Sequence, residues 1–167
     1  MSKSSTVNSR ENQAQNASKS TGGWFGVRAD TLTIQTAERV ELKDVTEQIG
    51  DLVRRSGVRE GIVSLWSMHT TCAVFINEAQ RALHADIKRL LETMVDRHAD
   101  WMHNDPQHSD CDRVNADSHL RAMLLGHSLT LQVTGGEPVL GQWQRVLVAE
   151  LDGPRSRTLR VQVMGVA

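Results

Sequence analysis

The fold follows from the C-terminal stretch Ser128–Met164, which reads SLTLQVTGGEPVLGQWQRVLVAELDGPRSRTLRVQVM. Apolar and polar side chains alternate at its start, which is typical of a strand with one buried face. Gly135-Gly136 is a hairpin signal, and Asp152-Gly153-Pro154 is a second turn signal. The stretch therefore predicts strands joined by turns, at 128–133, 139–151 and 158–164.

The segments upstream of this stretch predict further strands and three helices. Short β-rich or apolar runs predict strands at 30–36, 62–66 and 72–76. Apolar residues repeat at helical spacing in two longer segments, 44–57 and 80–97. Asp117 or Ser118 can cap a short third helix, 119–125, which Gly126 ends. Because this order has no βαβα rhythm, we expect an α+β fold: a mostly antiparallel, β-sandwich-like sheet with two main helices and one short helix.

The composition fits one globular domain behind a polar tail. The chain has 167 residues, and residues 1–23 are rich in Ser, Asn, Gln and Thr. We therefore expect a disordered tail at 1–23 and a single domain at 24–167. A formal net charge of −1 argues against a nucleic-acid partner. No apolar run approaches the roughly 20 residues of a membrane span. Two cysteines and no apolar secretion signal indicate a reducing, cytoplasmic location.

The segment His98–His119 contains four of the seven histidines, five aspartates and Cys111. It lacks helical and strand periodicity, and a loop of this length is usually functional or disordered. Because it runs directly into the apolar segment 120–126, we expect it to be ordered. Imidazole and carboxylate groups in one place suit a metal or phosphate site, although the spacing matches no standard local zinc signature.

Two further groups of polar residues stand at the ends of predicted elements. His69 precedes the strand 72–76, and Glu78 follows it. Both are either site residues or ordinary polar groups at strand ends. Asp117, His119 and Arg121 stand at a predicted helix start, where free amides and the helix dipole favour anions. Arg121 can grip a phosphate in bidentate fashion, whereas Asp117 can act as a helix cap only.

In this order, these motifs resemble those of the YjbQ family, also described as secondary thiamine-phosphate synthases. The likeness covers the chain from about Trp24 onward. The matching residues are His69-Thr70-Thr71, Asn77-Glu78, Asp86, His103, Asn115-Ala116-Asp117-Ser118-His119-Leu120-Arg121-Ala122, Leu125-Gly126, Gly141, Trp143-Gln144 and Glu150. This chain departs from the family pattern at Ala79–Ala82, where Asp-Pro is common, and at four single positions. These are Trp101 for Tyr, Arg121 for Lys, Gln142 for Thr and Arg145 for Gly.

The resemblance implies a homotrimer with a site near the subunit boundaries. It also implies that members join hydroxymethylpyrimidine diphosphate to a thiazole phosphate, which gives thiamine phosphate and pyrophosphate. In that case a divalent metal, zinc or magnesium, would be held by His69, His103 and His119, all present here. Arg121 would add donors, while Glu78, Asp86 and Asp117 would orient the imidazoles.

Three hypotheses remain open from the sequence. The first is a thiamine-phosphate-synthase-like transferase acting on small phosphorylated metabolites. The second is a non-enzymatic module that binds a phosphorylated metabolite or a metal. The third is a metal-dependent hydrolase, in which a metal-bound water is the nucleophile.

Overall fold

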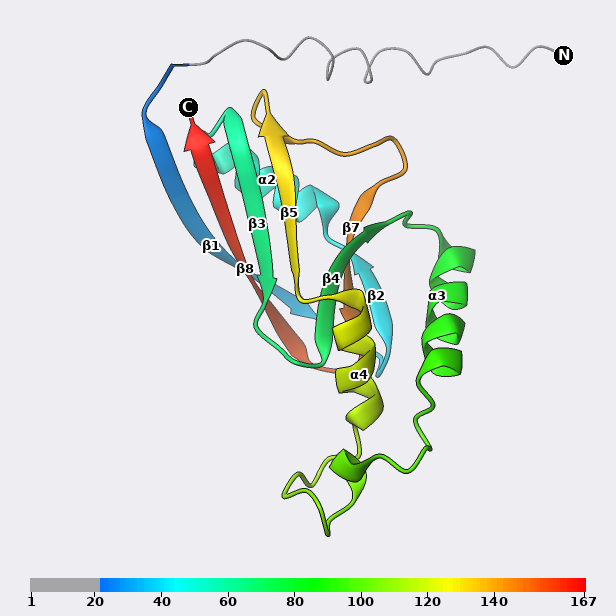
Figure 1. Ribbon diagram of the computed structural model, residues 1–167. Coiled ribbons are helices and arrows are strands. Elements are labelled where there is room, and N and C mark those ends of the chain that lie inside the picture. Colours follow the sequence, from blue (N-terminus) through cyan, green and yellow to red (C-terminus); the bar gives the residue numbers. More distant parts are fainter. Residues whose placement is uncertain (1–21) are drawn as a thin grey trace, which may run out of the picture.

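A computed structural model of the chain describes residues 22–167 (Figure 1). Residues 1–21 of the predicted tail lie outside the described residues. The described part has two β-sheets and a layer of helices. Within it, no helix is long and apolar enough to cross a membrane.

The larger sheet has five strands in the order β1-β8-β3-β5-β6. Their bounds are β1 (Phe25–Gln35), β8 (Ser156–Val166), β3 (Glu60–Ser67), β5 (Ser128–Thr134) and β6 (Glu137–Pro138). The smaller sheet has the order β2-β7-β4, with β2 (Glu41–Asp44), β7 (Arg145–Glu150) and β4 (Cys72–Asn77). Every strand pair is antiparallel, which confirms the predicted α+β class.

Two apolar cores hold these layers together. The first lies between the sheets and includes Val63 of β3, Val161 of β8 and Val148 of β7. The second lies between the smaller sheet and the helices, and includes Ala149 of β7 and Ile87 of α3 (Arg81–Met94). Successive side chains of a strand point to opposite faces. Strand β7 therefore contributes to both cores, and its residues 146–150 are all buried.

Helix α2 (Thr46–Ser56) closes the first core, and its bounds follow from local hydrogen bonds. Its N-terminal amide at Thr46 donates to Asp44 Oδ1 at 2.9 Å. Its C-cap is Gly57, in the left-handed region at φ 76°, where glycine carries no Cβ penalty. The predicted end at Gly57 is confirmed, and the helix buries Ile49 and Val53 against the larger sheet.

The other helices cover the smaller sheet. Gln80 caps α3 by accepting a hydrogen bond from the Leu83 amide at 2.7 Å, and the helix ends at Met94, three residues before the predicted end. The short helix is α4 (Ala116–Leu125), which follows a 3-10 turn, η1 (Met102–Asn104). Its start was predicted three residues too late, because Asp117 lies inside the first turn and is not its cap.

The C-terminal stretch contains the predicted hairpin, but one of its predicted strands is divided in the structure. Gly135 and Gly136 have φ of 63° and 86°, the left-handed values that a tight hairpin needs, and they join β5 to β6. The predicted strand 139–151 is divided, because residues 141–144 form a turn closed by the Gln144 side chain on the Gly141 amide. Strand β2 was not predicted; it has four residues, too few to show periodicity.

Candidate functional site

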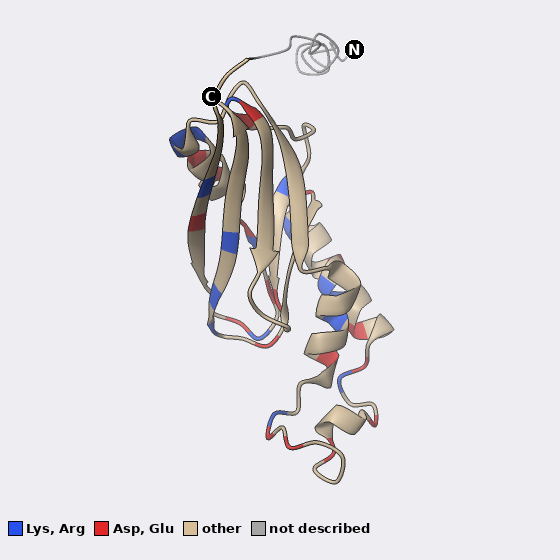
Figure 2. Ribbon diagram, turned by 60° about the vertical axis from the view of Figure 1, so that its left-hand side comes forward, with Lys and Arg blue, Asp and Glu red and all other residues tan. Residues whose placement is uncertain are grey.

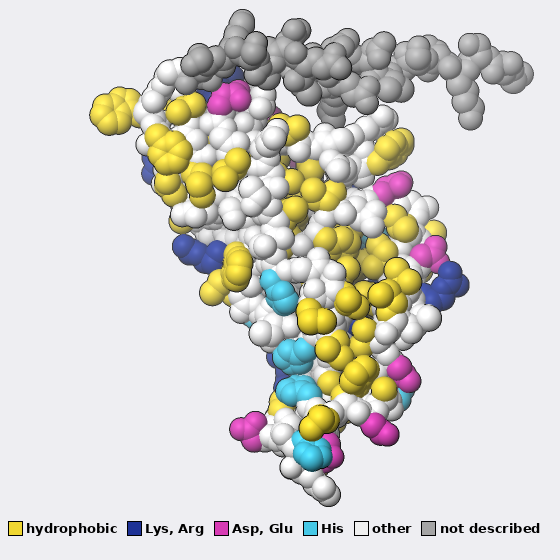
Figure 3. Space-filling model, in the orientation of Figure 1, with side chains coloured by type: hydrophobic (Ala, Val, Ile, Leu, Met, Phe, Trp, Pro, Cys, Tyr) yellow, Lys and Arg dark blue, Asp and Glu magenta, His cyan; other side chains and the backbone are white. Residues whose placement is uncertain are grey.

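The structure brings His103 and His119 into contact. Their ring centroids are 5.0 Å apart and the rings meet edge to face at 78°. His103 lies in η1 and His119 in the second turn of α4, so the connection between α3 and α4 folds back on the helix that follows it. In Figure 3, histidine side chains gather on the lower half of the visible face, beside exposed apolar side chains.

Amide side chains fix the connection to the start of α4. Asn104 Oδ1 accepts a hydrogen bond from the Ala116 amide at 2.9 Å. The Asn115 side-chain amide donates to Asp152 Oδ2 at 2.9 Å, in the segment between β7 and β8. Consequently one of the amides expected to be free for an anion is already paired. Charged positions are sparse on the strands and gather around α4 and the 95–115 connection (Figure 2).

The surroundings of His119 favour its neutral form. Burial lowers its pKa below the ordinary value of 6.5, and the neighbouring His103 lowers it further. The Nε2 atom of His103 is buried and has no hydrogen-bond partner among the described residues. A buried ring nitrogen without a partner costs free energy. The pair therefore offers one neutral imidazole and one unused nitrogen for a ligand, a proton or a metal ion.

His69 lies at the same end of the molecule but is already engaged. Its Nε2 accepts a hydrogen bond of 2.8 Å from the Thr158 amide at the start of β8. A nitrogen that accepts cannot carry the proton, so neutral His69 has its proton on Nδ1. Burial, followed by the charge of Arg157, lowers the His69 pKa. His69 therefore presents an N–H donor to any ligand at this end, in place of the free Nε2 that a metal site would use.

Asp117 and Arg121 form an ion-pair cluster inside the protein. Both Asp117 oxygens are paired with Arg39 at 3.1 Å, and Arg121 lies 3.2 Å from Asp117 Oδ2. Arg121 also donates to the Val95 carbonyl at 2.8 Å and is 2% exposed. In the described chain its guanidinium therefore holds α4 in position, a role different from the phosphate grip expected from the sequence. The part played by Arg39 was missed, because no sequence signal links it to a residue 78 positions away.

A second buried ion pair lies under His69. Arg157 donates through Nε to Glu150 Oε2 at 2.6 Å, and its Nη2 also donates to Glu150. The same Nη2 donates to the Thr71 hydroxyl at 3.0 Å, beside His69. The sequence marked Glu150 through the family pattern but gave Arg157 no role. The available signal was an arginine at an inward-facing position of a strand whose neighbouring inward positions are apolar.

Three other predicted groups, Glu78, the motif around Trp143 and Asp86, lie away from the histidine pair. Glu78 is exposed and follows Asn77, at the end of β4 opposite Cys72, so about 20 Å of strand separates it from the His69 end. The motif around Trp143 lies at the same far end, because Asn77 pairs with Arg145. Asp86 is on α3 and forms an exposed ion pair with Arg89. A single chain therefore does not unite all the predicted site residues.

Of the three histidines predicted to hold a metal ion, two are suitable ligands as they stand and one is not. Among residues 22–167, no three His, Cys, Asp or Glu side chains are arranged to hold a metal ion. The unused Nε2 of His103 and the neutral ring of His119 are suitable nitrogen ligands. Imidazole suits zinc, whereas magnesium prefers oxygen. The third predicted ligand, His69, would have to release the Thr158 amide first.

The chain matches known proteins over nearly all its described length. The family model described as UPF0047 protein YjbQ-like matches residues 30–166. A UPF0047 protein of Methanothermobacter thermautotrophicus is 44% identical over 144 residues, 86% of this chain and 96% of the relative. The YugU protein of Bacillus subtilis is 30% identical over 135 residues, 81% of this chain and 98% of the relative. A crystal structure from Sulfolobus solfataricus, described as a YbjQ-like protein of unknown function, has a TM-score of 0.79 at 34% identity. It covers 85% of this chain and 99% of its own.

Proposed function

We propose, from the premise that this chain belongs to the YjbQ-like UPF0047 family, that its histidine pair forms a phosphate-handling site with thiamine-phosphate-synthase-like activity. The observation that carries the proposal is the contact of His103 with His119, in which one Nε2 is buried and without a partner. Polar groups left unpaired in a native protein call for an explanation, and a ligand supplies one.

In the proposed reaction, hydroxymethylpyrimidine diphosphate loses pyrophosphate. The bond between the methylene carbon and the diphosphate oxygen breaks, and its electron pair leaves with pyrophosphate. The thiazole nitrogen uses its own electron pair to form the new carbon–nitrogen bond. Negative charge therefore builds on the departing oxygens, and preorganised donors stabilise such charge.

The residues of this chain meet that need as neutral donors. The His69 Nδ1–H points away from the Thr158 amide and can donate to a phosphate oxygen. The lowered pKa of His119 favours its neutral form, which can donate one ring N–H. A zinc ion bound by His103 and His119 would supply further positive charge. Asp117 and Arg121 act as positioning residues, because they hold the first turns of α4 from inside the protein.

The test is thiamine-phosphate formation from the two phosphorylated substrates, with and without added zinc. We expect His119→Ala and His103→Ala to lose about 10²- to 10⁴-fold of the rate, the range for removing an acid–base or donor group. His108→Ala is the matched control. His108 is exposed, and its one charged neighbour among the described residues is Asp105, also exposed, at 3.7 Å. Unchanged turnover in folded His119→Ala contradicts the proposal.

Two further measurements, ligand-induced thermal shift and phosphate release, separate the two other hypotheses. A phosphorylated ligand that raises the melting temperature and is never converted favours a binding module. Release of phosphate from simple esters without a second substrate favours a hydrolase.

We also propose that the helical layer mediates a homotrimer. Leu90 and Met94 on α3, and Met123 and Leu124 on α4, are each about half exposed or more. Contiguous exposed apolar side chains are typical of interaction sites. The number three rests on the family resemblance. Light scattering should give the mass of three chains or of a multiple of three. The double variant Met94→Glu with Met123→Glu should no longer form this assembly.

A further inference from the structure

We infer that the outer edge of β1 pairs antiparallel with β1 of a second copy, with Arg28 of each chain across from Asp30 of the other. The inference is independent of the proposed function. It starts from the position of β1, which ends the five-stranded sheet and, among residues 22–167, pairs on one side only, with β8 (Figure 1). An open edge presents unpaired amides and carbonyls, which are a template for another strand.

In the described part of the chain, the side chains of the first part of β1 are exposed on both faces of the strand. Residues 25–31 are all exposed, although they belong to a strand of eleven residues. Trp24, just before the strand, is 92% exposed, and Phe25 is 66% exposed. The chain therefore maintains a long strand segment whose apolar side chains gain little from the chain's own core. Pairing with a second copy would bury part of that surface.

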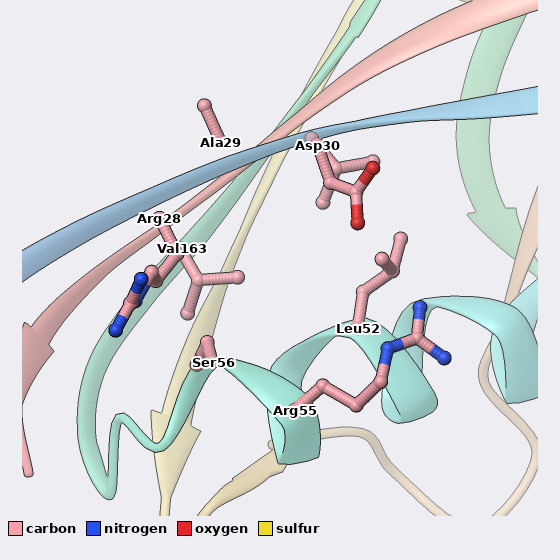
Figure 4. Close-up of a pocket in the computed structure, with 8 residues that line it drawn as sticks. Arg28, Ala29, Asp30, Leu52, Arg55, Ser56 and Val163 are labelled. Carbon is pink, nitrogen blue, oxygen red and sulfur yellow. The ribbon is translucent and has the colours of Figure 1, made fainter.

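The charges of β1 are uncommitted within the chain. Arg28 has no ion-pair or hydrogen-bond partner among the described residues, and Asp30 accepts only the amide of its neighbour Thr31, at 2.7 Å. Both line a hollow of about 280 Å³ between β1 and α2, which has an apolar floor at Leu52 and Val163. Figure 4 shows the Arg28 guanidinium and the Asp30 carboxylate extending away from one another. Each is therefore available to a partner.

Only one register satisfies these charges. A two-fold pairing centred on Ala29 places Arg28 opposite the second copy's Asp30, and Asp30 opposite its Arg28. A shift of the centre to Arg28 or to Asp30 places like charges directly across. Opposite charges across an antiparallel pair stabilise it, and like charges destabilise it. In the Ala29 register, Val27 meets Thr31 and Phe25 meets Thr33, which are pairs that suit a sheet.

A single edge charge has the opposite effect and guards a strand against pairing. Without Asp30, Arg28 would have no counter-charge across the pair. Two opposite charges two residues apart are instead complementary to themselves. A two-fold contact joins copies in pairs; where its axis crosses the axis of a trimer at a right angle, the trimer becomes a hexamer with closed symmetry.

The test is the mass of the full chain by native mass spectrometry and sedimentation. We expect an even number of chains for the wild type. Arg28→Asp places acidic groups across from one another and should halve the mass. The double variant Arg28→Asp with Asp30→Arg restores complementarity and should restore the wild-type mass. Arg55→Asp is the matched control, because Arg55 lines the same hollow from α2 and should leave the mass unchanged.

Three outcomes would overturn the inference: an odd number of chains in the wild type, a mass that Arg28→Asp does not change, or a double variant that stays dissociated. A misfolded single variant does not rescue it, since the double variant and the wild type still decide. In addition, amide exchange of residues 25–33 in the wild type should slow as the protein concentration rises. Exchange that is independent of concentration also contradicts the pairing.

Discussion

Glu150→Gln tests the buried ion pair beneath His69. Glu150 is fully buried, and Arg157 is 2% exposed. The carboxylate accepts hydrogen bonds from Arg157 Nε at 2.6 Å, from the Thr36 hydroxyl at 2.9 Å and from the Asp152 amide at 2.8 Å. Glutamine keeps the shape and one acceptor but removes the charge. Arg157 then remains in the interior without a counter-charge.

Leaving one partner of a buried pair without the other costs about 3–5 kcal/mol. For a chain of this length, each kcal/mol lowers the melting temperature by roughly 2–4 °C, so a decrease of roughly 6–20 °C is expected. Urea unfolding followed by tryptophan fluorescence gives the free energy of unfolding directly. The control is Asp86→Asn, which removes an exposed pair with Arg89 and should cost less than about 1 kcal/mol. If Glu150→Gln costs no more than that control, the assigned role of the pair is wrong.

Three further predictions concern the Asp117 ion pairs, the close approach at Gly61, and the pKa values of two histidines. Asp117→Asn leaves two arginines without their shared carboxylate and should lower the free energy of unfolding by about 3–5 kcal/mol in urea titrations. Gly61→Ala should destabilise by about 1–3 kcal/mol or more, because its Cβ would lie 2.1 Å from a backbone oxygen of β8; Gly26→Ala, with nothing within 4 Å, should be neutral in the same thermal melts. The pKa values of His69 and His119 in the folded chain are lowered from 6.5. As the pH falls, these histidines therefore take up protons in the unfolded chain before they do so in the folded chain. Stability should therefore be full above pH 6.5 and decline below it, and replacing both histidines by glutamine should flatten that decline in unfolding titrations from pH 7 to 5.5.

Local periodicity was enough to predict most of the fold. Strands β1, β8, β3 and β5 and helices α2 and α3 carry their pattern in contiguous residues, so their existence follows from the sequence, whereas the two-residue strand β6 was not predicted. The division of residues 139–151 does not, because the apolar Val139 and Leu140 continue the pattern up to the turn at Gly141. The separation into two sheets also escapes the sequence, because it depends on which distant strands pair.

The sequence predicted which residues belong to the candidate site but not the contacts that each of them makes. The sequence and the family pattern singled out His103 and His119, which are in contact in the structure. What they do there depends on partners that no spacing reveals. The His69 Nε2 is taken by a backbone amide 89 residues away, and Asp117 is paired with Arg39 across 78 residues. Such long-range pairs are set by the packing of sheets and helices, so the expected roles of Arg121 and His69 could not be judged beforehand.

Strand β7 belongs to both apolar cores, and this has a consequence for how the protein denatures. If the core between the sheets is lost, β7 loses one face; if the helical core is lost, it loses the other. Neither half can melt while leaving the shared strand in its native environment. The described domain should therefore behave as one cooperative unit, with a single calorimetric transition whose measured enthalpy equals the van't Hoff enthalpy.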